Sequence, residues 1–145
     1  MENRNITVEI LKKVDELWEL ENAFLKDVGE EEMTLAHFHR LAEAVAAEKI
    51  IFFAARKNGR VIGMCSVSPC FSTFACKACG VFDDFFIYPE ERGRGAARQL
   101  VNAACEWCKA NEYASLMVGC SRMDTAMYQS LGFDTELGVM LAANL

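Results

Sequence analysis

Two adjacent carboxylic acids stand inside a run of residues that otherwise has the pattern of a buried strand, Val81-Phe82-Asp83-Asp84-Phe85-Phe86-Ile87. Aspartate is a poor strand residue, and burying its charge without a partner is costly. Because side chains alternate along a strand, Asp83 and Asp84 are expected to point to opposite faces. A carboxylate among phenylalanines loses hydration, which raises its pKa and suits a general base near neutral pH. The alternative is that one acid binds a loop amide and the other faces solvent.

The same segment runs into a glycine-rich turn that opens a helix, Arg92-Gly93-Arg94-Gly95-Ala96-Ala97-Arg98. Glycine lets the backbone approach a ligand closely, and the start of a helix presents unpaired N–H groups to an anion. These features predict a phosphate or nucleotide site, with a plain strand–turn–helix connection as the alternative. A dinucleotide fingerprint fits badly because Arg98 stands where its third glycine belongs, and the sequence has no Walker Gly-Lys-Ser/Thr motif.

The seven cysteines include two Cys-x-x-Cys pairs, Cys76/Cys79 and Cys105/Cys108, which together look like a zinc tetrad. Cys105 and Cys108 follow the spacing of an apolar helical stripe, where cysteine behaves as a small hydrophobic residue. Turning them toward a metal would expose that stripe. We therefore predict reduced thiols and no metal, with a zinc or redox module as the alternative.

The surrounding pattern predicts the elements that must position these residues. Thr34 is expected to cap a helix, Asn58-Gly59 predicts a hairpin turn, and 69–80 is expected to be a loop. Strands are expected at 6–11, 50–55, 61–67, 81–88, 116–120 and 133–141, and helices at 14–28, 35–45, 97–108 and 123–131. The order β-α-α-β-β-β-α-β-α-β indicates an α/β fold, a mixed sheet of the α+β kind covered by helices.

Composition limits the classes of protein that fit. The chain has 145 residues, of which 52% are hydrophobic and 25% charged, which fits one globular domain over 1–145. A net charge of −6 disfavours nucleic-acid partners, because their binding surfaces are basic. The apolar runs are too short to span a membrane, and the polar, acidic N-terminus argues against a signal peptide. We therefore expect a cytoplasmic protein with no nucleic-acid or membrane partner.

The turn Arg92-Gly93-Arg94-Gly95-Ala96-Ala97 resembles the Arg/Gln-x-x-Gly-x-Gly/Ala signature of the GNAT superfamily of N-acetyltransferases. Downstream, Tyr128-Gln129-Ser130-Leu131-Gly132-Phe133 resembles the second hallmark of that family, a tyrosine on a short helix followed by Leu-Gly-Phe. The predicted element order matches the family from the first strand to the last. The resemblance implies the GNAT acyl-CoA N-acyltransferase fold over nearly the whole chain, with acetyl-CoA as cosubstrate.

This resemblance also implies which positions contact the coenzyme. Backbone groups of Phe85, Phe86 and Ile87 would hold the pantetheine arm like an added strand. Backbone amides of the turn would hold the pyrophosphate, with arginine side chains beside them: Arg92, Gly93, Arg94, Gly95, Ala96, Ala97 and Arg98. Many members carry asparagine seven residues before the tyrosine, and here that place is Ser121.

Catalytic roles follow from the resemblance as well. Asp83 falls where many members keep a catalytic glutamate, and Asp84 where several keep a second acid, as in the locally similar polyamine acetyltransferases. Asp83 would take a proton from an ammonium group, the free amine would attack the acetyl carbonyl, and Tyr128 would protonate the departing thiolate. The alternative for Tyr128 is a core-edge tyrosine packing on Phe133.

The implied function is therefore direct acetylation of a primary amine on a small, cationic acceptor. An acetyl-CoA-binding sensor or regulator without catalysis is the alternative from another class. The resemblance also leaves a homodimer open, because members of this family often dimerise.

Overall fold

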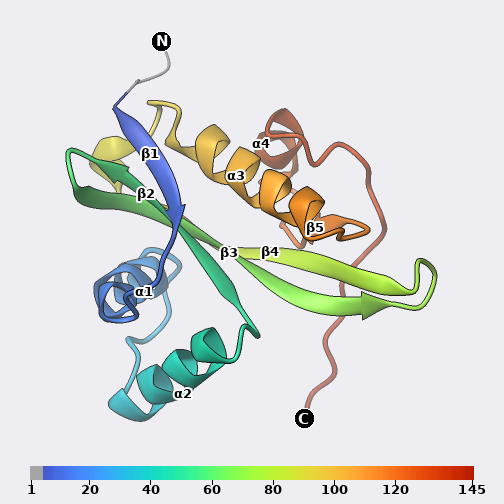
Figure 1. Ribbon diagram of the computed structural model, residues 1–145, viewed down its shortest axis with the longest axis horizontal. Coiled ribbons are helices and arrows are strands. Elements are labelled where there is room, and N and C mark those ends of the chain that lie inside the picture. The colour runs from blue at the N-terminus through green and yellow to red at the C-terminus, as the bar shows by residue number, and fades with distance from the viewer. Residues whose placement is uncertain (1–4) are drawn as a thin grey trace.

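The computed structural model describes residues 5–145 as a single mixed sheet with helices on both faces (Figure 1). In chain order the elements are β1 (Ile6–Ile10), α1 (Asp15–Asp27), α2 (Leu35–Ala46), β2 (Ile51–Lys57), β3 (Arg60–Ser72), β4 (Lys77–Ile87), the 3-10 helix η1 (Pro89–Glu91), α3 (Ala96–Ala110), β5 (Leu116–Val118) and α4 (Thr125–Ser130). The sheet order is β1-β2-β3-β4-β5, antiparallel except for the parallel pair β4–β5. This confirms the predicted fold class.

Two hydrophobic clusters lie on opposite faces of the sheet. On one face α3 buries Leu100 and Val101 against the sheet residue Phe82, and α4 packs at the edge of the same cluster. On the other face α1 buries Leu17 and Leu20, and α2 packs beside them. The sheet thus lies between α3 on one side and α1 and α2 on the other, in three layers (Figure 1). The third helix carries the predicted apolar stripe, so the spacing of its residues was sufficient to orient it.

Two predicted local signals are confirmed. Asn58 and Gly59 connect β2 to β3 with φ of 52° and 77°, the left-handed pair that a tight two-residue hairpin turn requires. The Thr34 hydroxyl accepts a hydrogen bond from the backbone N–H of His37 at 3.1 Å, which caps α2. Both are short-range effects that depend on few residues.

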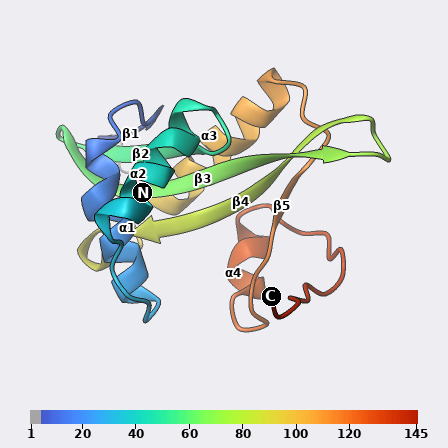
Figure 2. The same cartoon turned by 90° about the horizontal axis from the view of Figure 1, so that it is seen from below.

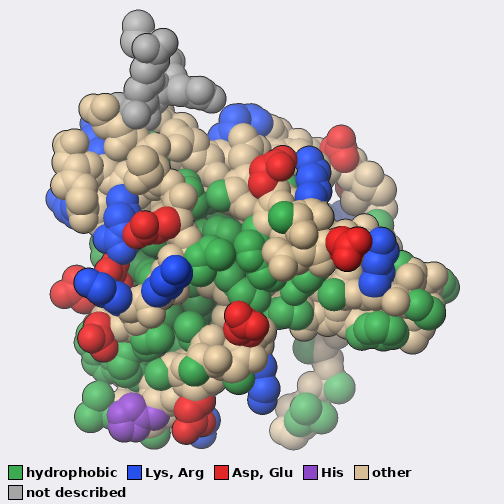
Figure 3. All heavy atoms as spheres, in the orientation of Figure 1, with side chains coloured by type: hydrophobic (Ala, Val, Ile, Leu, Met, Phe, Trp, Pro, Cys, Tyr) green, Lys and Arg blue, Asp and Glu red, His purple; other side chains and the backbone are tan. Residues whose placement is uncertain are grey.

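The loop predicted over 69–80 is wrong. β3 runs to Ser72 and β4 begins at Lys77, so the two strands form a long hairpin that projects from the body (Figures 1 and 2). Pro69 is tolerated because the pairing of β3 with β2 ends at Val67, so its missing N–H costs no bond on that side. Hydrophobic side chains gather at this end of the molecule (Figure 3), and Phe74 at the tip is fully exposed.

The strand predicted over 133–141, the last β of the expected element order, is also wrong. Residues 133–145 form no helix or strand. A strand is stable only when its N–H and C=O groups find a neighbouring ladder. The nearest strand in sequence, β5, is three residues long and pairs with β4 alone. Gly138, with φ of 134°, further interrupts extended backbone, and the apolar residues around it are exposed.

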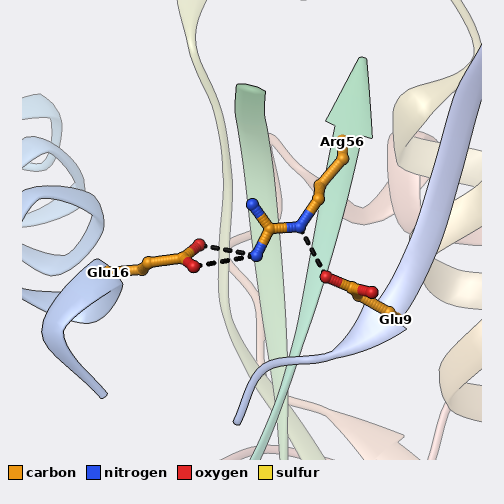
Figure 4. Close-up of polar contacts among 3 residues, drawn as sticks. All are labelled: Glu9, Glu16 and Arg56. Atoms are coloured by element: carbon orange, nitrogen blue, oxygen red, sulfur yellow. Dashed lines mark hydrogen bonds and ion pairs between the residues drawn. The ribbon is translucent and has the colours of Figure 1, made fainter. Parts of the chain in front are cut away.

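Ion pairs connect the start of α1 to strands β1 and β2, at the β1 edge of the sheet. The Arg56 guanidinium donates through Nε to Glu9 on β1 and through Nη2 to both carboxylate oxygens of Glu16 on α1, at 2.9 and 2.7 Å (Figure 4). A surface depression at this end is lined by Lys13 and these three residues among others, and by none of the predicted site residues. This contact therefore serves to position α1.

Candidate active site

Strand β4 loses its neighbour β5 halfway along its length. The parallel pairing covers Gly80 to Phe82 on β4 and then stops, while β4 itself continues to Ile87. Within residues 5–145, the backbone from Asp83 to Ile87 therefore has one edge that pairs with no strand. An exposed edge of this kind can bind an extended ligand as an added strand.

A β-bulge interrupts β4 at this point. Met64 on β3 opposes Phe86 and Ser66 opposes Asp83, so Asp84 and Phe85 together face a single residue of β3. Asp84 has φ of 48°, a left-handed conformation that aspartate adopts more readily than most residues. The strict alternation behind the prediction of opposite faces for Asp83 and Asp84 is therefore broken.

The two aspartates have different surroundings. Asp84 is half-buried, and its Oδ2 accepts a hydrogen bond from the hydroxyl of the fully buried Ser66 at 2.7 Å. Burial, followed by the charge of Asp83, raises the pKa of Asp84, while the hydrogen bond from Ser66 opposes that rise. Asp83 is exposed, and its Oδ1 accepts a bond from the Asp84 N–H at 2.9 Å. Asp83 is thus accessible to a ligand, whereas Asp84 is held by the protein.

A third carboxyl group, Glu21 on α1, joins this site although the sequence interpretation did not include it. Its side chain is only 7% exposed. Burial, and then the negative charge of Asp84, raise the pKa of Glu21 from 4.5 to about 8. The signal in the sequence was its spacing: Glu21 follows Leu17 by four residues and precedes Phe24 by three, so an acid stands on the apolar stripe of the helix.

The glycine turn leaves open space at the start of α3. Gly93 and Gly95 have φ of 77° and 93°, and a Cβ on either would meet no atom within 4 Å. The Gln99 N–H bonds to the Gly95 carbonyl, which leaves the three preceding amides of the helix without intrahelical acceptors. Those amides belong to Ala96, Ala97 and Arg98. Free amides beside open space of this kind can bind an anion.

The three arginines of the turn differ in what they contact. Arg92 donates from Nε to the Ile87 carbonyl at 2.8 Å and from Nη2 to Asp27 of α1 at 3.2 Å. Arg98 donates to the Ser130 carbonyl at the end of α4 at 2.7 Å. Arg94 is exposed and, within the described residues, forms no ion pair. Arg94 therefore has the cationic side chain most available to an anion.

Tyr128 lies beside β4 on the α3 side of the sheet. Its ring contacts Phe85 and Phe133, with centroids 6.0 and 5.9 Å away. Burial, followed by the charge of Asp124 and then that of Asp83, raises the pKa of Tyr128 to about 12. The packing on Phe133 that was the alternative for Tyr128 is present, and it places the hydroxyl-bearing residue near the β4 bulge at the same time.

The other predicted coenzyme positions lie around the same point. Phe85 is half-buried and packs on the hydrophobic cluster between the sheet and α3. Phe86 is buried in the cluster between the sheet and α1, and Ile87 is the last residue of β4. Ser121 is exposed, and its hydroxyl donates to Asp124 at 3.0 Å, just before α4. The structure thus brings β4, the glycine turn and α4 together. Ser121 instead forms a hydrogen bond within the loop that precedes α4.

The cysteines are distributed between core and surface. Cys108 is buried in the α3 cluster, Cys105 is half-buried, and Cys70 and Cys79 oppose each other across the hairpin with sulfur atoms 2.9 Å apart. Over residues 5–145, no three His, Cys, Asp or Glu side chains are grouped as metal ligands.

In the same part of the chain, no helix is long and apolar enough to cross a bilayer.

Comparison with known proteins gives the family. Residues 14–133 match the model of the acetyltransferase (GNAT) family. An uncharacterized N-acetyltransferase from Bacillus subtilis (strain 168), YhfO, is 26% identical over 91 residues, which span 61% of each protein. The chain thus aligns with less than two thirds of that relative.

Solved structures share the fold. An aminoglycoside acetyltransferase from an uncultured soil metagenomic sample, meta-AAC0020 in complex with sisomicin, superposes with a TM-score of 0.87 at 12% identity, covering 99% of this chain and 97% of that one. A predicted acetyltransferase with acetyl-CoA from Clostridium acetobutylicum gives 0.76 at 18% identity, covering 94% and 96%. At these identities the likeness concerns the fold alone. Because the family model covers most of the sequence, the chain belongs to the acetyltransferase (GNAT) family.

Proposed function

We propose that the protein transfers the acetyl group of acetyl-CoA directly to a primary amine of a small, cationic acceptor. The observation that carries this proposal is a meeting of three features: the unpaired edge of β4, the open glycine turn at the start of α3, and two adjacent carboxylates on β4. The first two suit an extended ligand that ends in phosphates. The third suits a cation that must lose a proton.

The coenzyme side of the proposal uses backbone groups. Backbone from Phe85 to Ile87 would bond the pantetheine arm along the free edge of β4, although the Ile87 carbonyl already accepts from Arg92. The open turn at Gly93 and Gly95 has room for a pyrophosphate against the start of α3. Arg94 would add the charge-assisted contact. Bound acetyl-CoA supplies an acetyl thioester to the free edge.

On the acceptor side, the first requirement is removal of a proton. An alkylammonium has a pKa of about 10 and is no nucleophile until it is deprotonated. Asp83 is exposed next to a second carboxylate, Asp84, so the pair attracts a cation and Asp83 can accept its proton directly or through water. The neutral amine then attacks the acetyl carbonyl, the thioester C–S bond breaks, and the nitrogen loses its second proton to water, which leaves the amide and the coenzyme A thiolate.

Tyr128 would assist the departing sulfur. A tyrosine hydroxyl is protonated at neutral pH, the state that an acid requires, and the raised pKa of Tyr128 makes it a weaker acid than an ordinary tyrosine. Full transfer to a thiolate whose conjugate acid has an ordinary pKa of about 8.5 is uphill by about 3.5 units. Hydrogen bonding to the developing thiolate is therefore the larger part of the contribution that we assign to Tyr128.

Relatives support the class of acceptor without fixing it. The structure of meta-AAC0020 holds sisomicin, and another structural neighbour is a glucosamine-6-phosphate N-acetyltransferase from Arabidopsis thaliana. Both names describe small acceptors that carry amines. A cationic acceptor agrees with the paired aspartates of this chain. A single domain, a homodimer, a cytoplasmic location and freedom from metal stay predictions of the sequence.

The test is an amine panel incubated with acetyl-CoA, read as release of free thiol. Diamines, amino acids, amino sugars and aminoglycosides would cover the acceptor classes. Gly95→Glu serves as the variant that should not bind acetyl-CoA, because its carboxylate would enter the open phosphate site. Gly29→Glu is the matched control, because Gly29 has the same left-handed backbone and equally open space at the end of α1. Acetyl-CoA binding without thiol release for any amine would favour the sensor instead.

A further inference from the structure

Glu21 has the least solvated carboxyl group of the candidate active site, and its burial has no counter-charge. It lies on α1, where Leu17 and Leu20 are the other buried residues, and α1 packs against β4. Within residues 5–145 Glu21 forms no ion pair, and its Oε1 is buried without a hydrogen-bond partner. Both oxygens of an ionised carboxylate would need donors in such a place, and one has none.

The contact that Glu21 does make is with another acid. Its carboxyl group lies close enough to that of Asp84, across the α1–β4 interface, for the negative charge of Asp84 to raise the pKa of Glu21. Two carboxylates have only acceptors, so a hydrogen bond between them requires that one carries a proton. The groups near the pair include the Ser66 hydroxyl, which donates to Asp84, the carboxylate of Asp83 and the buried thiol of Cys65. None of these three supplies positive charge.

The arrangement also shows which acid holds the proton. Asp84 accepts a hydrogen bond from the Ser66 hydroxyl, and it is partly open to solvent. Glu21 is nearly sealed from solvent and receives no donor on Oε1. The negative charge is therefore better stabilised on Asp84, and the proton is better placed on Glu21. The raised pKa of Glu21, about 8, agrees with this assignment.

We propose that Glu21 is a positioning residue that stays protonated at neutral pH and donates its carboxyl proton to Asp84, so that Asp84 remains ionised and fixed at the β4 bulge. This inference rests on the proposed function, because the purpose of the charged Asp84 is to bind the ammonium group beside Asp83. Glu21 itself does not touch the acceptor. Its effect passes through the charge and orientation of Asp84.

Two variants test whether a neutral hydrogen-bond donor at position 21 is sufficient to keep Asp84 ionised. Glu21→Gln keeps the shape and an N–H donor, and it should retain an acceptor KM close to wild type. Glu21→Leu keeps the bulk but has no donor, so Asp84 loses its anionic state more readily, and the KM for the amine should rise about 10-fold. The KM for acetyl-CoA should not change in either variant. Glu19→Leu is the matched control, because Glu19 is exposed on the same helix.

A second measurement does not depend on turnover. With ¹³C-labelled glutamate, infrared spectroscopy at pH 7 should show a protonated carboxyl band that disappears in Glu21→Gln and persists in Glu19→Leu. If wild type acetylates no amine, the proposed function fails while this band still decides the state of Glu21. Absence of the band, or an equal loss of amine affinity in the Gln and Leu variants, would overturn the assignment. An unchanged amine KM in Glu21→Leu, in protein of normal stability, would do the same.

Discussion

Asp83 and Asp84 are neighbours in sequence, yet the β4 bulge gives their side chains different surroundings. Asp84 is anchored by Ser66 and sits against α1, whereas Asp83 is exposed and accepts only the local N–H of Asp84. A residue that must meet a substrate and exchange a proton with it needs access, which Asp83 has. A residue that must hold a charge in place needs donors, which Asp84 has.

Replacement of Asp83 by asparagine tests whether Asp83 accepts the proton. Asp83→Asn keeps the shape but cannot accept the proton, so turnover should fall by about 100-fold while acetyl-CoA binding persists. Raising the pH should restore part of the rate, because more of the amine arrives already neutral. Steady-state kinetics across pH, with calorimetry for acetyl-CoA, provides the measurement.

Two further variants act as internal comparisons. Asp84→Asn should raise the KM for the amine more than it lowers turnover, and Tyr128→Phe should lower turnover less with a thioester whose leaving thiol is more acidic. Wild-type turnover in Asp83→Asn together with a large loss in Asp84→Asn would assign the base to Asp84. Wild-type rates in all three variants would leave coenzyme positioning as the source of catalysis.

Residue types alone predicted the acids on β4 but not their geometry. Aspartates in an apolar strand are detectable because they violate strand preference. The bulge depends on pairing with β3, which lies about twenty residues away in sequence, and no local pattern encodes it. Glu21 was detectable in principle as an acid on an apolar stripe, but its partner Asp84 is known only from the packing of α1 on β4.

At the scale of elements, the sequence predicted what short-range rules determine. The hairpin turn at Asn58-Gly59, the cap at Thr34 and the stripe of α3 are each set by a few adjacent residues. The extension of β3 and β4 past Pro69 was not predicted, because it depends on where β2 stops pairing. The missing strand over 133–141 depends in the same way on its neighbour, because β5 offers only three residues with which to pair.

The arginines of the turn yield an element-scale prediction. Arg94→Ala should weaken acetyl-CoA binding on the order of 10-fold at low salt, with a smaller deficit at high salt, because screening weakens the contact that is lost. Arg92→Ala should instead lower the free energy of unfolding by about 1 kcal/mol, since Arg92 ties η1 to β4 and α1 through Ile87 and Asp27.

Calorimetric titration and urea denaturation of both variants would separate ligand binding from structural support. The two substitutions remove the same side chain two positions apart, so each is the control for the other. Equal losses of acetyl-CoA affinity, with unchanged stability in both, would mean that Arg92 leaves its protein partners when the coenzyme binds.

At the scale of the whole molecule, the neighbouring acids Glu21 and Asp84 make the free energy of unfolding depend on pH. Glu21 has a pKa of about 8 in the folded protein against 4.5 as its ordinary value. Between these values the unfolded chain releases a proton that the folded protein retains, so the free energy of unfolding should fall as pH rises. The contribution is fully present below pH 4.5, is lost through pH 8, and changes by at most about 1.4 kcal/mol per pH unit.

Glu21→Gln should flatten this dependence. Its advantage over wild type should grow from pH 5 to pH 8 and reach a few kcal/mol, since glutamine has no proton to lose. Urea denaturation at several pH values gives both curves. Asp84 also has a raised pKa and adds a slope of the same sign, so the variant should retain some of it. Parallel curves for the two proteins would mean that Glu21 is ionised when folded.

The early end of the β4–β5 pairing has a consequence for how the molecule comes apart. β3 and β4 share a long ladder, whereas β5 is attached to the sheet by three residue pairs, and α4 by the aromatic contacts of Tyr128 and by Arg98. Local opening should therefore begin with β5 and α4 while β2 to β4 stay closed. Amide hydrogens of β5 should exchange with deuterium well before those at the centre of β3. The same weak attachment lies next to the free edge of β4, so the part of the protein that opens most easily borders the part that has to admit a ligand.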